Sequence, residues 1–457
     1  MRRICYFMLS LVLLLGLAAC GPAGDSGDKD DPAPSVVTNQ TYQSYWMKQH
    51  DYKTMPIAAF NTVPPKVGAY AQNFITEENY RILAESGINT AYCLYDKLDT
   101  YPEDVINALA YCEKYGVSYV AGLNNAHGQT SSSILESVIY QTLIKNKPKA
   151  LGGVMIMDEP AYINMSAMAT SRKCFEELLD KKLYYSGNLF PTYATQSQLY
   201  NRDTGSPALP EGGYSYEQYV QDYIELYKPQ ALSYDYYPVQ GSYPNLSGGY
   251  YENMSIIRKY AMQAEIPFWV YIQTCSFNAN VRIPTEEEIN WLVNSSLAYG
   301  CKGIQYFTYW CPLSGGEVFN GAMIDVDGNK TEVYGYVQKI NRQIAAVDEV
   351  LMCSLSKGIM VSGASPCAIP EEDVIESYQN LTDVSGATAL VGCFDYNGKP
   401  AYYVFNNNNT LQEAISLTFD SPCKGYTVQA AEKEAFSDTS VMELTLKAGE
   451  AVLVVLE

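Results

Sequence analysis

The strongest constraint on the fold is a regular alternation of short apolar runs with amphipathic stretches between Met55 and Val347. Eight runs have the length and composition of strands: 56–60, 90–94, 118–123, 153–157, 183–188, 231–234, 267–272 and 303–307. Between them, apolar residues recur with the period of an α-helix. The predicted helices cover residues 76–86, 102–115, 131–145, 165–179, 216–227, 250–263, 285–299 and 333–346.

Eight consecutive strand–helix units are typical of a closed (β/α)₈ TIM barrel. The runs are apolar on both faces, as parallel strands covered by helices must be. The main alternative, a doubly wound open sheet, needs a glycine-rich phosphate loop after its first strand. Residues 60–65 contain no glycine. The sequence therefore predicts an α/β fold whose barrel domain spans residues 41–350.

The pattern changes after about Cys353, where runs of alternating apolar residues are separated by Asn, Gly and Pro. The segment Asp-Tyr-Asn-Gly at 395–398 is a strong hairpin signal. We expect a small all-β sandwich over residues 351–457.

The N-terminus resembles a bacterial lipoprotein signal peptide. Arg2 and Arg3 precede an apolar run at 4–16, and Leu-Ala-Ala-Cys at 17–20 resembles a lipobox, in which Cys20 would be palmitoylated and anchored in the membrane. Residues 21–40 predict a flexible linker, because their early part has almost no apolar side chains. The acidic run at 25–31 resembles an export signal of Gram-negative lipoproteins. We expect an outer-membrane lipoprotein, facing the surface or the periplasm.

Composition limits the ligand classes. A net charge of −20 argues against nucleic acid, whose phosphates the protein would repel. The 41 tyrosines suit the stacking of sugar rings, although most tyrosines only pack. The absence of a Cys-x-x-Cys pair and the presence of only two histidines argue against a zinc site. A neutral, polyhydroxylated ligand fits best, and no metal or cofactor is expected.

In a TIM barrel the reactive groups lie just beyond the C-terminal ends of the strands. The side chains that follow the predicted strands are Asp96, Asn124, Asn125, His127, Asp158, Glu159, Asn188, Asp235, Tyr236, Tyr237, Gln273, Tyr309 and Trp310.

Asp158 and Glu159 give the sharpest signal, because a strand without polar side chains delivers two adjacent carboxylates to the mouth of the barrel. Partial burial and a charged neighbour raise the pKa of a carboxylic acid, as a general acid at neutral pH requires. Glu159 is therefore the leading catalytic candidate. The structural alternative is an acidic cap of the next helix, since acids before Pro160 suit a helix start.

The motif Asp-Glu-Pro at 158–160 resembles the acid/base position of glycoside hydrolases of the β-galactosidase type, where Asn-Glu-Pro is commoner. Asp-Glu-Pro itself is similar to β-N-acetylgalactosaminidase-like families, in which the aspartate orients a substrate acetamido group. Residues 231–238, 282–285 and 300–310 also look like barrel glycosidases. The resemblance implies an O-glycosyl hydrolase that cleaves exogenous oligosaccharides or polysaccharides without a cofactor.

One position departs from that resemblance. Retaining enzymes of the large clan carry a glutamate nucleophile at the end of strand 7, where this chain has Gln273. Glu286, Glu287 and Glu288 do not replace it, because Thr285-x-x-Glu288 is a helix capping box.

Three alternatives remain open at this point. Glu159 as general acid is compatible with Asp158 positioning a substrate 2-acetamido group that acts as the nucleophile. It is equally compatible with Asp235 as the base that activates water, with inversion at a carboxyl separation of about 6.5–9.5 Å. If neither the substrate acetamido group nor Asp235 plays the second role, the chain is a non-catalytic glycan-binding lipoprotein. Asp235 also has a structural alternative, an Asx turn before Tyr-Tyr-Pro.

Further substrate-binding candidates come from the same strand ends. Their aromatic rings would stack on sugars and their amides or carboxylates would bind hydroxyl groups. These candidates are Asp96, Asn125, Tyr236, Tyr271, Gln273, Tyr309 and Trp310.

Overall fold

The computed structural model describes residues 53–457, except for 67, 69, 94–101, 123–127, 138–139, 181–182, 203–205 and 314–316. The predicted signal peptide with Cys20, the linker at 21–40, and the candidates Asp96 and Asn125 lie outside the described residues. Within them, no helix is both long and apolar enough to cross a membrane.

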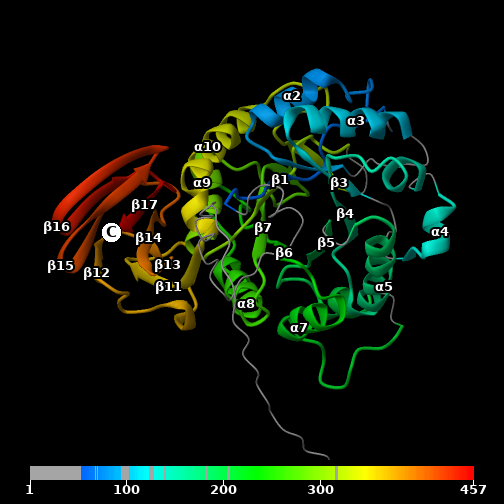
Figure 1. The fold of residues 1–457 in the computed structure, drawn as a ribbon. Helices are drawn as coiled ribbons and strands as arrows, with labels where there is room; N and C mark the ends of the chain where they lie inside the picture. Colours follow the sequence, from blue (N-terminus) through cyan, green and yellow to red (C-terminus); the bar gives the residue numbers. More distant parts are fainter. Residues whose placement is uncertain are drawn as a thin grey trace, which may run out of the picture. The chain divides into compact units, whose positions relative to one another are not determined.

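Eight parallel strands form a closed barrel with helices around it (Figure 1). The strands are β1 (Ile57–Ala59), β2 (Thr90–Cys93), β3 (Ser118–Gly122), β4 (Leu151–Asp158), β5 (Tyr184–Leu189), β6 (Leu232–Asp235), β7 (Phe268–Gln273) and β9 (Ile304–Phe307). Parallel pairing of β1 with β9, Ile57 opposite Ile304, closes the ring. This closure confirms the TIM barrel prediction, with the strands almost entirely buried and helices around the outside of the ring.

The helices follow the predicted periodicity with local differences. They are α2 (Glu77–Glu85), α3 (Pro102–Tyr115), α4 (Ser131–Leu135), α5 (Tyr162–Leu178), α6 (Gln196–Tyr200), α7 (Tyr216–Tyr227), α8 (Tyr250–Gln263), α9 (Glu286–Ala298) and α10 (Glu332–Met352). The predicted helix at 131–145 is instead α4 followed by a π-helical turn, η2 (Tyr140–Ile144). The capping box of α9 is confirmed: the Thr285 hydroxyl accepts from the Glu288 amide, and the Glu288 carboxylate accepts from the Thr285 amide.

A short antiparallel ribbon, absent from the sequence prediction, lies in the loops that follow β7 and β9. It pairs β8 (Cys275–Phe277) with β10 (Phe319–Gly321), with Phe277 opposite Phe319. The phenylalanine rings of this pair contact Phe307 at the end of β9, with centroid distances of 5.6 Å and 6.3 Å. The ribbon is thus anchored on the barrel by aromatic packing.

The C-terminal strands confirm the predicted β-sandwich. They are β11 (Ser354–Ser362), β12 (Leu381–Gly386), β13 (Ala389–Tyr396), β14 (Lys399–Asn406), β15 (Glu413–Gln429), β16 (Glu432–Leu446) and β17 (Ala451–Leu456). All belong to one hydrogen-bonded sheet. The first part of β15 pairs with β12 and the last part with β17, so this long strand is shared by both layers. A second apolar core, which includes Val391, Tyr402, Leu417 and Val454, lies between the layers.

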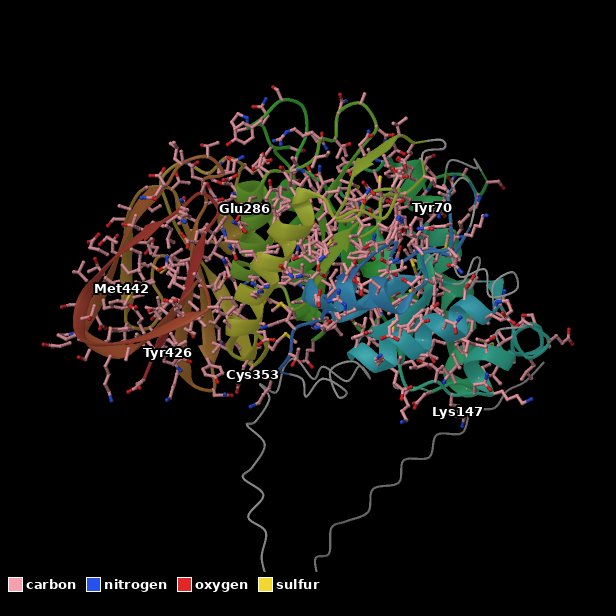
Figure 2. The ribbon with its side chains drawn as sticks, turned by 90° about the horizontal axis from the view of Figure 1, so that it is seen from above. Tyr70, Lys147, Glu286, Cys353, Tyr426 and Met442 are labelled. Carbon is pink, nitrogen blue, oxygen red and sulfur yellow. The ribbon has the colours of Figure 1, made fainter. Side chains whose placement is uncertain are left out.

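The barrel and the sandwich belong to one compact unit and meet along α9 and α10. Figure 2 shows Cys353, where α10 gives way to β11, between the two parts, with Met442 and Tyr426 on the sandwich. The buried Asn407 side-chain oxygen accepts two hydrogen bonds from the barrel, from the Tyr251 hydroxyl at 2.7 Å and the Trp291 indole at 2.9 Å. The interface is therefore specified by polar pairing within an apolar contact.

We predict that Asn407→Ala lowers the free energy of unfolding by about 2–4 kcal/mol, because two buried donors lose their acceptor. Chemical denaturation followed by tryptophan fluorescence measures this. Asn380→Ala is the matched control, since the Asn380 side chain makes only an exposed hydrogen bond to Asp420. Equal unfolding free energies for the two variants would contradict the role of Asn407.

Candidate active site

A cavity of about 620 Å³ opens at the C-terminal ends of the barrel strands. Its described lining comprises Phe60, Asn61, Asp158, Glu159, Asn188, Tyr193, Gln198, Asp235, Tyr237, Tyr271, Phe277, Asn278, Phe307, Thr308, Pro312, Glu317 and Phe319. The volume suits one or two sugar rings. Asp158, Glu159, Asn188 and Asp235 come from the ends of β4, β5 and β6, whereas most of the aromatic rings come from β7, β9, the ribbon and the residue after β1.

The end of β4 brings two neighbouring carboxylates into this cavity. In a regular strand, successive side chains point to opposite faces. Here the register with β5 shifts between Met155 and Met157, and Glu159 adopts a left-handed backbone with φ of 46°. The Glu159 amide donates to the Asn188 carbonyl at 2.8 Å, and its carbonyl accepts from the Arg202 guanidinium at 3.1 Å. These contacts hold a conformation that costs a non-glycine residue free energy, which is common at functional sites.

The helix-cap alternative for Asp158 and Glu159 is wrong. Helix α5 begins at Tyr162, and Ala161 is the capping position. The Ala161 backbone amide donates to the Asn164 side-chain oxygen at 3.2 Å. Both carboxylates precede the cap and line the cavity instead.

All three predicted catalytic carboxyl groups have raised pKa values. Burial raises the pKa of Glu159 to about 7, the Asp158 charge adds to the rise, and Arg202 opposes it. Burial raises the pKa of Asp158 to about 6, against a hydrogen bond from Asn188, although its side chain remains open to solvent in the cavity. Asp235 is 6 % exposed, and burial, followed by the charges of Glu159 and Asp158, raises its pKa well above the usual range. Glu159 therefore holds its proton near neutral pH, as a general acid requires.

A buried hydrogen-bond chain fixes the position of Asp235. The Gln305 amide donates to the Ser233 hydroxyl at 2.7 Å, and Ser233 donates to the Asn188 side-chain oxygen at 2.9 Å. The Asn188 amide then donates to the Asp235 carboxyl at 3.0 Å. Because its oxygen is occupied by Ser233, Asn188 must present its NH₂ group to the carboxylates. The structure places Asp235 in the cavity, held by a side chain of the neighbouring strand.

The opposite wall is aromatic. The Tyr237 ring lies 5.1 Å from Phe277 and 5.3 Å from Phe307, and the Phe60 ring lies 5.7 Å from both Phe307 and Tyr271. Such a cluster offers an apolar face to a ligand whose polar groups meet the carboxylates.

Of the predicted binding residues within the described part, Tyr271 lines the cavity and four others do not. The Tyr236 hydroxyl bonds to Ser247 at 2.8 Å, and its ring supports Tyr193, which does line the cavity, at 5.2 Å. Tyr309 is fully buried, and Trp310 packs against Phe74 at 4.6 Å.

Gln273 is also outside the cavity. Its amide donates to the Val239 carbonyl at 3.1 Å and the Arg282 carbonyl at 2.5 Å, and its oxygen accepts from the Val239 amide. Gln273 thus connects the loops that contain Val239 and Arg282. In the retaining glycosidases that the Asp-Glu-Pro motif resembles, the nucleophile would stand at this position.

Several lining residues had no predicted role. Asn188 and Tyr237 follow predicted strands, so the strand-end rule located them without distinguishing them from other polar strand ends. Tyr193, Asn278, Glu317 and Phe319 lie in loops or in the ribbon, where no periodic pattern marks them.

The described residues contain no cluster of three or more His, Cys, Asp or Glu side chains placed to hold a metal ion.

Comparisons with known proteins agree with the barrel fold. The β-galactosidase family, glycoside hydrolase family 42, matches residues 209–347, a part of the barrel that includes Asp235 and ends beyond Glu317. A β-galactosidase from Bacillus circulans sp. alkalophilus is similar in structure, with a TM-score of 0.58 and 8% identity over 89% of this chain and 99% of that chain. The fold is that of glycoside hydrolase TIM barrels.

A second solved structure extends the likeness in fold. An α-amylase from Anoxybacillus has a TM-score of 0.50 and 11% identity over 89% of this chain and 98% of that chain. A search of curated proteins found no match.

We predict that Glu159→Gln stabilises the protein above pH 7 by about 1–2 kcal/mol, after allowance for the water in the cavity. The folded pKa of about 7 exceeds the ordinary 4.5, so the folded wild type binds more protons between these values and loses stability as pH rises through them. The amide cannot ionise and escapes this loss. Denaturant titrations at pH 4 and pH 8 measure the difference.

Glu434→Gln serves as the control, because Glu434 is an exposed acid of β16. An unchanged stability difference between Glu159→Gln and the wild type across this pH range would show that Glu159 titrates normally.

Proposed function

We propose that this protein is a glycoside hydrolase acting on exogenous glycans, with Glu159 as the general acid. The observation that carries the proposal is the placement of Glu159 in the cavity beside Asp158, at the end of β4, with a pKa near neutrality. A carboxylic acid that keeps its proton at pH 7 can deliver it to the glycosidic oxygen of a departing alcohol.

We propose further that the nucleophile is the substrate's own 2-acetamido group. The end of β7 carries Gln273, whose amide is engaged by backbone groups and cannot attack an anomeric carbon. Asp158 is adjacent to the acid and open to the cavity. Its carboxylate would accept a hydrogen bond from the acetamido N–H, turning the acetamido oxygen toward the anomeric carbon.

The two steps then balance without a protein nucleophile. The acetamido oxygen bonds to the anomeric carbon as the glycosidic bond breaks, and Glu159 protonates the leaving oxygen. Asp158 stabilises the positive charge that develops on the cyclic intermediate. The Glu159 carboxylate next takes a proton from water, which attacks the same carbon and reopens the ring. Two displacements leave the anomeric configuration unchanged.

The inverting alternative assigns Asp235 as the base that activates water. Its presence in the same cavity favours this reading. The burial of Asp235 argues against a role as general base. It raises the pKa of this carboxyl group well above the usual range, so the group is protonated when a base is needed. A non-catalytic glycan-binding protein is the remaining alternative.

The test uses aryl glycosides of 2-acetamido sugars beside their 2-hydroxy counterparts, in both anomeric forms. We expect turnover of a 2-acetamido glycoside with retention, observed by proton NMR of the first product formed. Asp158→Asn should lower kcat roughly 100-fold, and Glu159→Gln roughly 1,000-fold on substrates with poor leaving groups. Asp383→Asn on the exposed part of β12 is the control.

Other outcomes assign the chemistry differently. An inverted product, or equal turnover of 2-hydroxy glycosides, would transfer the second role to Asp235. Binding without turnover in every glycoside would identify a glycan-binding protein.

The N-terminal sequence supports a second proposal, that Cys20 is lipidated and tethers the barrel to a bacterial envelope membrane. A single thioester- or amide-linked chain binds weakly, so lipoprotein anchoring requires several chains at this cysteine. Expression with labelled palmitate should label the wild type and leave Cys20→Ser unlabelled. Equal labelling of both would exclude Cys20 as the anchor.

A further inference from the structure

The cavity is acidic beyond its catalytic groups. Glu317 contributes a fourth carboxyl group, in addition to Asp158, Glu159 and Asp235, and the described lining residues include no Lys, Arg or His. The nearby Arg202 is occupied by the Glu159 carbonyl and lies over the Phe190 ring at 5.8 Å. An anionic ligand would therefore meet more acidic than basic groups among the described lining residues, with Arg202 offsetting only part of their charge.

Glu317 is held at the rim by the ribbon. The Asn278 side-chain amide donates to the Glu317 carboxylate at 2.9 Å, and the Asn278 backbone N–H donates to the Val318 carbonyl at 3.3 Å. Immediately beyond these residues, Phe277 and Phe319 pack against each other at 6.3 Å and anchor the ribbon on the barrel. The Asn278 side chain thus holds the Glu317 carboxylate at the ribbon.

Depth in the cavity separates two groups of residues. Asp235 and Asn188 are each 6 % exposed, whereas Glu317 and Asn278 are exposed. In a pocket closed at its base, the sugar that is cleaved off occupies the deep part and the leaving group extends through the rim. The charge of Glu317 also acts on Glu159, the group that faces the leaving oxygen.

We propose that Glu317, positioned by Asn278, is a specificity-determining residue for the leaving group. It accepts hydrogen bonds from hydroxyl groups of a neutral leaving sugar and repels leaving groups with a carboxylate or sulfate. The proposal rests on the proposed function and adds a substrate class to it: neutral glycans, with exclusion of chains that carry an acidic residue next to the cleaved bond.

The experiment compares two glycosides of the same 2-acetamido sugar, one with a 4-nitrophenyl and one with a 3-carboxy-4-nitrophenyl leaving group. Their kcat/KM values are measured at low ionic strength. We expect the wild type to favour the neutral leaving group by about tenfold, and Glu317→Gln by about threefold, because the other carboxyl groups remain. Added salt should reduce the wild-type ratio. Glu434→Gln, an equal loss of charge on the sandwich, should keep the wild-type ratio.

Binding separates this inference from the proposed function. Dissociation constants of both glycosides are measured by calorimetry on Glu159→Gln, with and without Glu317→Gln. If neither glycoside is hydrolysed, the proposed function fails, yet a binding ratio that falls with Glu317→Gln still supports the specificity role. The specificity role is overturned if Glu317→Gln leaves the ratio between the neutral and the carboxylated glycoside unchanged, in turnover or in binding. It is also overturned if neither glycoside binds.

Discussion

Closure of the parallel sheet is the constraint on which the remaining structure depends. Once β1 pairs with β9, all eight strands have their C-terminal ends on one rim, and residues far apart in the sequence must meet there. Closure brings together the strand ends that carry Glu159 and Asp235, and the local backbone at the end of β4 places Glu159 in the shared cavity. Their meeting creates an electrostatic problem, since neighbouring carboxylates in a partly buried site disfavour each other's ionised form.

The repulsion between the carboxyl groups is reduced mainly by protonation and by hydrogen bonds, and only to a small extent by cations. The chain from Gln305 through Ser233 turns the Asn188 amide toward the carboxyl groups, and Arg202 neutralises part of the charge from outside. Neither contact fully offsets the burial of charge, so the pKa values of Asp158 and Glu159 remain high. The same incomplete compensation that destabilises the ionised fold at neutral pH keeps a proton available for transfer.

The barrel was predictable from sequence because its strands are mostly apolar and most of its helices have a clear period. The Asp158–Glu159 site followed from the rule that chemistry lies at strand ends. The predictions that failed concern residues whose side-chain direction depends on the local backbone. The Tyr309 and Trp310 side chains are buried, with the Trp310 ring 4.6 Å from Phe74, and neither lines the cavity. The ribbon has three residues in each strand, too few for a period to be recognised.

Gln273 has a structural role at the end of β7. An amide can both donate to and accept from backbone groups, and Gln273 does both, so it joins the loops that contain Val239 and Arg282. A glutamate there has no donor for the two carbonyls and would leave them without their partner. The wall beside β7 is aromatic. In the proposed mechanism, the negative charge that faces a developing cation would come from the β4 side. Asp158, adjacent to the acid and open to the cavity, is the group positioned to supply it.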